Sequence, residues 1–545
     1  MIKRLIPMLF ICTTLSHAAD SDKDRCELNV APTQTVLVPE PPKTALNIVD
    51  LLNHLVKDPG KSLSDPEFKK MLGHVAQSLQ NEEKLEPNIR KVFSIAEKAG
   101  KLPPDLKPEQ KEFVISMLLN AIQAELQQRG YDEHQRNYET WEQLSQRLNG
   151  EIESLGITGA GVQSDHFWKT HAVQTNTTHH KASKAEILVD GPASFAKRGE
   201  LIDSAKKEIL IMSWSIEDDE TGEWLKQKLL KKISQGVSVK VMVDGQTAKR
   251  PGYKMVLQQL EEAQIEVIRW ISTDSSREFD GQHRKYMIVD GESLVGGGLN
   301  HGNHYSHMGP KEGHFWRDTD LSFEGPAVQA TRNQFVELWN EQISGTLHAD
   351  RTPLEANTLS TTGQRNMSVV NHIAGQGENI LRSIVLAIEA AERQVLIENA
   401  YFIVDPVVER ALTRSLARGV KVVIATNSAE SIDEPTVTRP ILKSLNKLFE
   451  VGASIYTKPG KLETLHSKVM AVDNHYAWVG SQNLHPRSYR YEGEVIFVSS
   501  SPTFVSKVNA MLRNDFESFI PMTEAFDVEE SDLLDFQEEL FFDQF

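Results

Sequence analysis

Two segments that lie far apart in the chain carry the same reactive residue types at the same spacing. Residues 283–290 read His-Arg-Lys-Tyr-Met-Ile-Val-Asp, and residues 466–473 read His-Ser-Lys-Val-Met-Ala-Val-Asp. Each segment is followed, at equal distance, by a glycine-containing turn that ends in an asparagine, Asn300 or Asn483. A single His-x-Lys pattern can lie on any ordinary strand, whereas two copies with matching tails indicate one site that uses the same groups twice.

These residue types suit the cleavage of a phosphate ester. One imidazole can attack phosphorus and form a covalent intermediate. A second imidazole can donate a proton to the leaving oxygen and then remove one from the incoming nucleophile. Lysine ammonium groups and asparagine amides can hold the phosphate oxygens. This chemistry requires neither a metal nor another cofactor, so none is predicted. The candidate catalytic residues are His283, Lys285, Asn300, His466, Lys468 and Asn483.

The surrounding sequence predicts the elements that position these groups. Residues 205–211 match 391–397, and residues 236–243 match 419–424, so each motif lies inside one copy of an internal repeat. In each copy, short apolar β-rich runs alternate with helical segments, which indicates an α/β sheet covered by helices. We predict two tandem α/β/α repeats that pack as a pseudo-two-fold dimer. A site on the pseudo-two-fold axis would receive the same motif from both repeats.

The N-terminus has the pattern of a secretory signal peptide. Lys3 and Arg4 precede an apolar stretch over residues 5–15, and Ala18 and Ala19 offer a cleavage site. The apolar stretch is short for a bilayer span, so we predict export to the periplasm or the medium rather than a membrane anchor. No later run is apolar enough to cross a membrane, so contact with lipid is expected to be peripheral.

The charge distribution disfavours nucleic acid as a partner. The formal net charge is -17, but no lysine or arginine follows Arg513, so much of the excess lies in an acidic tail. The body of the chain is only mildly acidic. Enzymes that act on nucleic acids usually carry a basic footprint, because neutralising phosphates supplies much of their affinity.

These signals predict a division of the chain into eight segments. The helical stripes between residues 45 and 155 are interpreted as packed core, with a membrane-binding face as the alternative. The acidic tail is interpreted as a solvated segment or a final helix, with a sorting or partner-binding signal as the alternative. The segments are a signal peptide (1–19), a flexible leader (20–44), a helical region (45–155), a linker (156–183), the first repeat (184–345), a linker (346–367), the second repeat (368–522) and the acidic tail (523–545).

The doubled motif is the HKD signature, and the chain resembles the phospholipase D superfamily over residues 184–522. Within that superfamily the sequence is most similar to bacterial cardiolipin synthase-type members. Further blocks that carry the similarity are residues 297–305, 316–328, 398–405, 426–428 and 483–488.

The resemblance implies roles for individual residues. One histidine forms the phosphohistidine, and in relatives this is usually the first-motif histidine, which corresponds to His283. Asp318 and Glu494 match acidic positions that orient the two imidazoles, because a carboxylate on one ring nitrogen fixes the tautomer and aims the other nitrogen. Asp290 and Asp473 complete the motif and are expected to be structural.

The chain departs from the resemblance at three points. Cardiolipin synthases of this type often carry N-terminal membrane helices, whereas this chain has a signal-like segment and a helical region. Gly298 stands where the second motif has the hydroxyl of Ser481. Extra histidines follow the first motif, and we interpret them as a polar loop rather than a metal site. These are His301, His304, His307 and His314.

The sequence therefore predicts an exported phospholipase D-type phosphodiesterase that acts on glycerophospholipids at a membrane surface. It would cleave the head-group ester through a phosphohistidine, with hydrolysis to phosphatidic acid, phosphatidyl transfer, or both. A cardiolipin synthase and an HKD-type nuclease remain alternatives, because the same motifs serve all three. A binding protein with an inactive site is disfavoured, since all six motif residues are present. The motifs leave the oligomeric state open.

Overall fold

The computed structural model describes most of the chain from residue 139 onward and parts of the region before it. The predicted signal peptide and leader (1–44) lie outside the described residues, as does the first part of the predicted helical region. The described residues are 85–98, 108, 111, 112, 114–116, 118, 119, 139–273, 277, 280–310, 314–344, 348–359, 366–375, 377–530, 535, 538 and 542.

The chain forms two compact units. The smaller unit comprises Met1–Tyr138, Asp433–Lys443 and Ala525–Phe545, and the larger comprises Glu139–Ile432 and Ser444–Glu524. In the smaller unit, helix α4 (Leu85–Lys98) buries Phe93. Val114 and Leu118, which lie in the region predicted to be helical, are also buried.

Part of the acidic tail belongs to the smaller unit and makes ion pairs there. Asp535 and Glu538 each pair with Arg439 and Lys443, at distances of 2.6 to 2.9 Å. Arg439 is buried. These tail carboxylates are therefore paired with cationic side chains rather than only solvated.

The larger unit contains two β-sheets, one for each predicted repeat. The first is seven-stranded, in the order β2-β9-β8-β7-β3-β4-β5, with β3, β4 and β5 parallel to one another and the other pairs antiparallel. Its strands are β2 (Ser183–Val189), β3 (Glu208–Ser213), β4 (Ser238–Asp244), β5 (Glu266–Trp270), β7 (Tyr286–Val289), β8 (Ser293–Gly297) and β9 (Thr319–Glu324).

The second sheet is ten-stranded, in the order β1-β10-β16-β15-β14-β11-β12-β13-β17, and β6 pairs with β16 beside this path. Here β11, β12 and β13 are parallel to one another. The strands are β1 (His179–His180), β6 (Gly281–Gln282), β10 (Met367–His372), β11 (Gln394–Asn399), β12 (Lys421–Asn427), β13 (Ser454–Lys458), β14 (Lys468–Val472), β15 (Tyr476–Gly480), β16 (Glu492–Ser499) and β17 (Ile520–Pro521).

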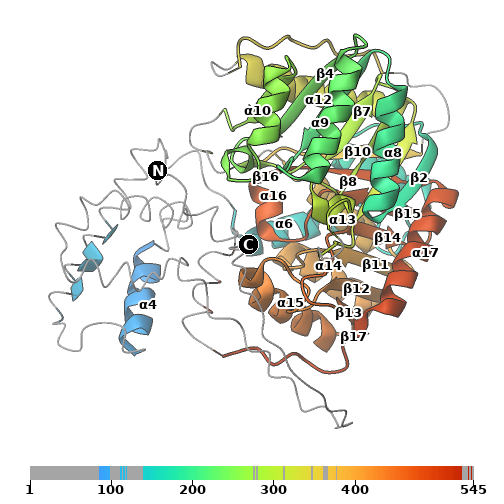
Figure 1. Cartoon of the computed structure of the whole chain (residues 1–545). Coiled ribbons are helices and arrows are strands. Elements are labelled where there is room, and N and C mark those ends of the chain that lie inside the picture. Colours follow the sequence, from blue (N-terminus) through green and yellow to red (C-terminus); the bar gives the residue numbers. More distant parts are fainter. Residues whose placement is uncertain are drawn as a thin grey trace, which may run out of the picture. The chain divides into compact units, whose positions relative to one another are not determined.

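The two sheets repeat one topology. The order β9-β8-β7-β3-β4-β5 of the first corresponds to β16-β15-β14-β11-β12-β13 of the second. Helices cover the sheets, as Figure 1 shows for α8, α9, α10 and α12 around the first and α13, α14 and α17 around the second. The predicted fold class, two tandem α/β/α repeats, is confirmed.

The helices of the larger unit are bounded as follows, with α15 continuing from the smaller unit. They are α6 (Trp141–Ser154), α7 (Asp165–Gln174), α8 (Asp190–Ser204), α9 (Glu220–Ile233), α10 (Met255–Glu262), α11 (Asn303–Ser306), α12 (Pro326–Ser344), α13 (Asn379–Ala390), α14 (Pro406–Ala417), α15 (Thr438–Glu450), α16 (Pro486–Arg490) and α17 (Pro502–Ser518). A short 3-10 turn spans Thr247–Lys249 in the larger unit, and another spans Pro435–Val437 in the smaller unit.

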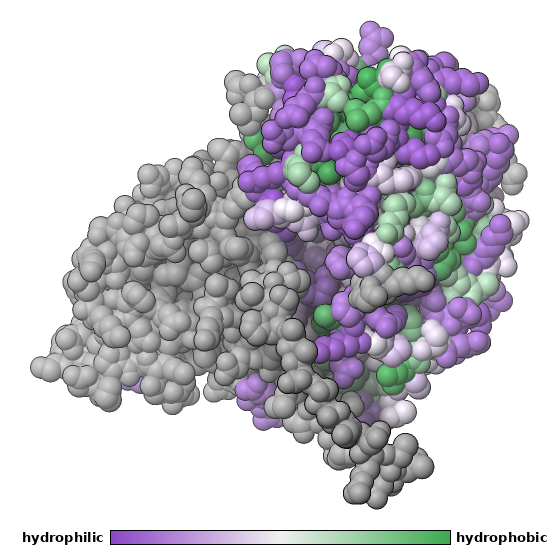
Figure 2. Space-filling model, in the orientation of Figure 1, coloured by the Kyte–Doolittle hydropathy of each residue, from purple (hydrophilic) through white to green (hydrophobic). Residues whose placement is uncertain are grey.

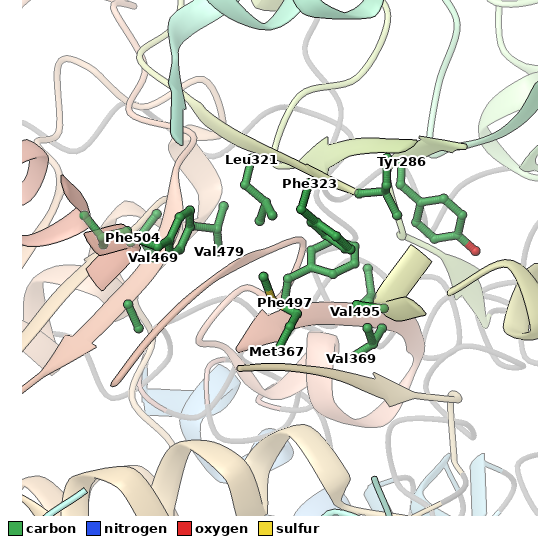
Figure 3. Packing of buried hydrophobic residues seen from close by; sticks show 14 of the residues in the cluster. Tyr286, Leu321, Phe323, Met367, Val369, Val469, Val479, Val495, Phe497 and Phe504 are labelled. Carbon is green, nitrogen blue, oxygen red and sulfur yellow. The ribbon is translucent and has the colours of Figure 1, made fainter. Parts of the chain in front are cut away.

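The two repeats share a hydrophobic core. Figure 3 shows side chains of both sheets packed together, among them Leu321 and Phe323 of β9 and Val495 and Phe497 of β16. The rings of Phe323 and Phe497 meet edge to face, with centroids 5.5 Å apart. Burying apolar area on both sheets at once stabilises their mutual placement, so the strands that carry the motifs are held rigidly relative to each other.

The segments expected to be linkers are built into the larger unit. Residues 156–183 contain α7 and β1, and Phe167 of α7 packs edge to face on Tyr476. The described part of the second linker runs along α12, where the indole N–H of Trp339 donates to the carbonyl of Thr352 at 3.0 Å. Apolar anchors such as Phe167 give these stretches a place in the core that their polar composition does not reveal.

In the part of the chain that the structure describes, no helix combines the length and the hydrophobicity that a bilayer crossing requires. On the side of the larger unit seen in Figure 2, hydrophilic residues predominate and apolar residues form small separate areas.

Candidate active site

Each motif histidine lies where its repeat meets the other repeat. The backbone N–H of His283 donates to the carbonyl of Gly493 at 2.9 Å, beside the parallel pairing of β6 with β16. The backbone N–H of His466 donates to the carbonyl of Arg317 at 2.7 Å, in the equivalent place just before β9. Each imidazole also experiences the charge of the lysine of the other motif, so the two motifs form one site.

The carboxylates that orient the imidazoles are exchanged between the repeats. Nδ1 of His283 lies 2.8 Å from Oε1 of Glu494, which belongs to the second repeat. Nδ1 of His466 lies 2.7 Å from Oδ2 of Asp318, which belongs to the first. A carboxylate accepts a hydrogen bond, so Nδ1–H donates and the lone pair of Nε2 remains for chemistry. The structure thus places Asp318 and Glu494 at the imidazoles, as the resemblance implies.

Burial sets the protonation of these pairs. The two imidazoles are almost fully buried, and loss of hydration lowers the pKa of His283 and of His466 well below the usual value. The same loss raises the pKa of Asp318 and of Glu494 to about 7. Neutral imidazoles with a free Nε2 are therefore favoured before substrate binds, which is the form that a nucleophile requires.

The motif lysines lie directly beside their histidines. The ammonium group of Lys285 donates to the carbonyl of His283 at 2.5 Å, and that of Lys468 donates to the carbonyl of His466. Both lysines are fully buried, and burial lowers the pKa of Lys285 to about 7. A bound phosphate would restore the charged form of the Lys285 ammonium group, because its negative charge offsets the desolvation.

The two asparagines have different hydrogen-bond partners. The amide of Asn300 donates to the hydroxyl of Tyr305 at 3.0 Å, and its oxygen accepts from Ser213 and Ser215 at 3.4 Å. Among the residues that the structure describes, the buried side-chain oxygen of Asn483 has no hydrogen-bond partner. A buried polar atom of this kind is uncommon, so the Asn483 oxygen still has capacity to accept a hydrogen bond, which a ligand hydroxyl could donate but a phosphate oxygen could not.

Asp290 and Asp473 stabilise the fold rather than the site. The carboxylate of Asp290 accepts hydrogen bonds from the backbone N–H groups of residues 206–208, at 2.7 to 2.9 Å. The carboxylate of Asp473 accepts from those of residues 392–394, at 2.6 to 2.8 Å. Each aspartate thereby joins the end of a motif strand to the start of its neighbour, β3 or β11.

The difference between Gly298 and Ser481 has a steric cause. A Cβ atom at position 298 would lie 2.0 Å from Oδ1 of Asp318, so only glycine fits beside that carboxylate. Ser481 instead donates its hydroxyl to Oε2 of Glu494, and Ser488 donates to Oε1. Ser488 ends one of the blocks that carry the resemblance, residues 483–488, but no role was predicted for it, because its distance from Glu494 along the chain carries no recognisable spacing.

Aromatic rings around the imidazoles were also missed by sequence reasoning. His466 lies among Tyr305, Trp316 and Tyr401, with ring centroids 5.2, 5.3 and 6.2 Å away. His283 meets Trp214 edge to face at 5.1 Å. Three of these rings lie in blocks that resemble relatives, but only folding brings them to an imidazole.

One group of side chains in the described residues could hold a metal ion, and it overlaps the site. His283, Glu492 and Glu494 each offer a ligand atom, all within 4.8 Å of one another. Nδ1 of His283 would have to lose its proton to bind a metal, and Glu494 already accepts hydrogen bonds from two serines. The motif lysines already supply positive charge to the site, so these residues fit a metal poorly. The absence of a metal remains a prediction.

The extra histidines of the first repeat bond to protein groups. His301 is buried, and its Nε2 lies 2.9 Å from the guanidinium of Arg198. His304 and His307 bond to the backbone carbonyls of His314 and Trp316, at 2.8 and 2.9 Å. They do not form a metal cluster among the described residues.

Comparisons with known proteins identify the family of this chain. The sequence matches the family described as "Cardiolipin synthase, PLD-like domain" over residues 199–313 and 384–517. It is 30% identical to Cardiolipin synthase A of Pseudomonas aeruginosa (strain LESB58) over 355 residues, which cover 64% of this chain and 70% of that protein. The chain belongs to the phospholipase D superfamily. Within it, the chain resembles the bacterial cardiolipin synthases, as the motifs implied.

Further relatives of the superfamily agree. The Major cardiolipin synthase ClsA of Bacillus subtilis (strain 168) is 29% identical over 350 residues, which cover 63% of this chain and 70% of that protein. The crystal structure of a phosphatidylserine synthase from Haemophilus influenzae Rd KW20 matches with a TM-score of 0.55 and 16% identity, covering 69% of this chain and 97% of that one. At this identity the match supports the fold alone. The phospholipase D superfamily member described here is thus an enzyme with phosphodiesterase or phosphatidyltransferase chemistry.

Proposed function

We propose that this enzyme is a phosphatidyltransferase that joins two phosphatidylglycerol molecules into cardiolipin and glycerol. The observation that carries the proposal is the pair of imidazoles, each oriented by a carboxylate of the opposite repeat. Such a pair supplies one nucleophile and one proton carrier on a single phosphorus. The similarity to cardiolipin synthases selects the substrate, since the geometry by itself suits any phosphodiester.

The reaction proceeds in two displacements. Nε2 of one neutral histidine attacks phosphorus and the bond between phosphorus and the glycerol oxygen breaks. The other histidine, which must carry a second proton on Nε2 once the negatively charged phosphate is bound, donates that proton to the leaving oxygen. Glycerol leaves, and the phosphatidyl group stays on the first histidine. The second histidine then removes the proton from a hydroxyl of another phosphatidylglycerol, whose oxygen displaces the histidine from phosphorus. The resemblance assigns the attack to His283, and we retain that assignment as part of the proposal.

Transfer is preferred over hydrolysis for two reasons. The sequence motifs leave hydrolysis and transfer open, and the predicted export favours hydrolysis to phosphatidic acid, but the relatives found by comparison are named as synthases. His283 and His466 are almost fully buried, and both lysines are inaccessible. A site that excludes water protects a phosphohistidine from hydrolysis and leaves it for an alcohol that the protein binds.

We also propose that the enzyme acts outside the cytoplasm, on a membrane surface. The support is the signal-like N-terminus and the lack of a later apolar run in the sequence. Peripheral contact would suffice, because both substrates of the proposed reaction reside in the bilayer.

Product analysis tests the proposed function. The purified protein, with His283→Ala and His466→Ala as controls, is added to phosphatidylglycerol vesicles in EDTA, and lipids are analysed by mass spectrometry. Cardiolipin and glycerol in equal amounts, formed by the wild type alone, are expected. Phosphatidic acid as the only product would replace transfer by hydrolysis. No lipid product, with cleavage of DNA or of a small phosphodiester instead, would overturn the substrate class.

A further inference from the structure

The pseudo-symmetry of the site identifies a pair of corresponding residues that differ in charge. Each histidine backbone N–H donates to the carbonyl of the residue just before the orienting carboxylate, Gly493 for His283 and Arg317 for His466. The residues one position earlier, Glu492 and Trp316, therefore correspond.

The surroundings of these two residues are unlike. Trp316 lies with its ring centroid 5.3 Å from that of His466. Glu492 places Oε2 3.9 Å from Nδ1 of His283, and the residue is only 6% exposed. Alternation along β16 puts Glu492 and Glu494 on the same face of the strand, so both point toward one imidazole.

The two oxygens of Glu492 have different roles in the structure. Oε1 accepts from Nε of Arg487 at 3.1 Å, which fixes the orientation of the carboxylate. Oε2 is buried and has no hydrogen-bond partner among the described residues. A carboxylate oxygen buried without a donor loses its hydration and must be offset by a nearby positive charge. A protonated His283 supplies such a charge.

We propose that Glu492 is a positioning residue, a second carboxylate that acts through His283 and stabilises its protonated ring. The inference rests on the proposed function and deepens it, because it concerns which histidine of the same site is protonated during the reaction. His466 has an aromatic ring at the corresponding place, so the two imidazoles differ in proton affinity although their motifs are the same.

Other charged groups around His283 do not remove the difference. Glu494 lies on the same strand and has its counterpart in Asp318, so that contribution occurs at both rings. Lys285, Lys468 and the imidazole of His466 all disfavour a proton on His283, and Glu492 opposes them. Among these charged groups, Glu492 is the one whose effect on the proton affinity of His283 has no counterpart at His466.

The first test measures the imidazole directly. The purified protein with 15N-labelled histidine is titrated in EDTA, and its ring signals are assigned with His283→Gln and His466→Gln. Glu492→Gln keeps the shape and removes the charge, so the midpoint for His283 should fall by roughly 0.5 to 2 pH units, with little change at His466. Arg487→Gln removes the cation that partly neutralises Glu492, so the same midpoint should rise.

Two controls separate the charge from packing. Glu492→Asp keeps the charge and should lie closer to the wild type than Glu492→Gln does. Glu450→Gln removes the same charge at an exposed position of α15 and should move neither histidine. An unchanged His283 midpoint in Glu492→Gln, or shifts of the same sign in Glu492→Gln and Arg487→Gln, would overturn the proposal.

The second test uses turnover and a divalent cation. One limb of the pH profile of kcat/KM should move with the His283 midpoint, the acidic limb if His283 attacks phosphorus and the basic limb if it donates the proton. Zn²⁺ or Mn²⁺ that raises activity in the wild type but not in Glu492→Gln would make Glu492 a metal ligand and overturn the proposal. The titration needs no substrate, so a wrong substrate assignment and a wrong role for Glu492 give different results.

Discussion

In the first repeat, the imidazole of His283 meets Trp214 and faces two carboxylates of β16, whereas in the second repeat the imidazole of His466 lies among three aromatic rings. The orienting carboxylate, the contact between lysine and histidine, and the backbone hydrogen bond of the histidine are alike in the two motifs. The comparison separates the features that both histidines need from those that only one of them needs. Both need an orienting carboxylate and a neighbouring lysine, whereas the groups around each ring differ. A displacement that uses one histidine as nucleophile and the other as acid is asymmetric, so unlike surroundings on like motifs are expected.

The largest effect should come from removing either histidine. We expect His283→Ala and His466→Ala each to lower kcat by at least about 10³-fold, because each ring takes part in both displacements. The double variant should be little worse than either single variant, since groups that act as a unit are not additive. Single-turnover product formation measures this. A single variant with more than about a tenth of wild-type kcat would show that one half of the site is dispensable.

The exchanged carboxylates should rank next. Asp318→Asn leaves the shape of the side chain but presents the wrong partner to Nδ1–H, so we expect kcat to fall by about 10²- to 10⁴-fold. Glu494→Gln should behave alike, because it has the same role at the other ring. The measurement is kcat of each variant at saturating lipid. A loss of kcat in only one of the two variants would show that the two carboxylates do not have equivalent roles.

Asp318→Asn should also change how the stability of the protein depends on pH. Burial raises the pKa of Asp318 from 3.8 to about 7, so the folded protein holds this proton more tightly than the unfolded chain does. Its contribution to stability therefore falls as pH rises from about 4 to about 7. Thermal unfolding should show that Asp318→Asn loses less Tm than the wild type between about pH 5 and about pH 8. An equal loss in both proteins would contradict the raised pKa.

A smaller effect should distinguish Gly298 from Ser481. Gly298→Ala forces a Cβ against the buried carboxylate of Asp318, so we expect about a 10- to 100-fold loss of kcat together with a lower Tm, because overpacking a buried position costs about 1 to 3 kcal/mol. Ser481→Ala removes one of two serine hydrogen bonds to Glu494, and about a threefold to tenfold loss is expected. If Ser481→Ala were the more damaging variant, the hydroxyl rather than the fit of the carboxylate would dominate orientation.

The smallest effect on activity should come from the motif aspartates. Asp473 is fully buried and Asp290 is not, so Asp473→Ala should cost about 2 to 4 kcal/mol of unfolding free energy and Asp290→Ala about 1 to 2 kcal/mol. Denaturant titration measures the cost, and kcat of the folded fraction should stay within about twofold. Because both residues adopt positive φ, asparagine substitutions are the milder control. A large loss of kcat would give these residues a role beyond the fold.

Several features of the fold could be predicted from the sequence because they depend on local patterns. Strands such as β7 and β14 appear as apolar runs of fixed length, and the repeat of these runs with intervening helices indicates the α/β sheet. The segment at residues 156–183 was expected to be a linker because it is polar overall. Its place in the fold depends on single anchors such as Phe167, whose partner Tyr476 is more than 300 residues away.

By itself the sequence determined the chemistry of the site, since the identity and spacing of His283, Lys285, His466 and Lys468 are read from short segments. The resemblance added Asp318 and Glu494 as partners of the imidazoles, without deciding which belongs to which ring. Only the tertiary structure decided that each carboxylate crosses to the histidine of the other repeat, and that His283 faces Glu492 where His466 faces Trp316. The reason is that these contacts join strands of two sheets, and their register depends on packing across a shared core rather than on separation along the chain.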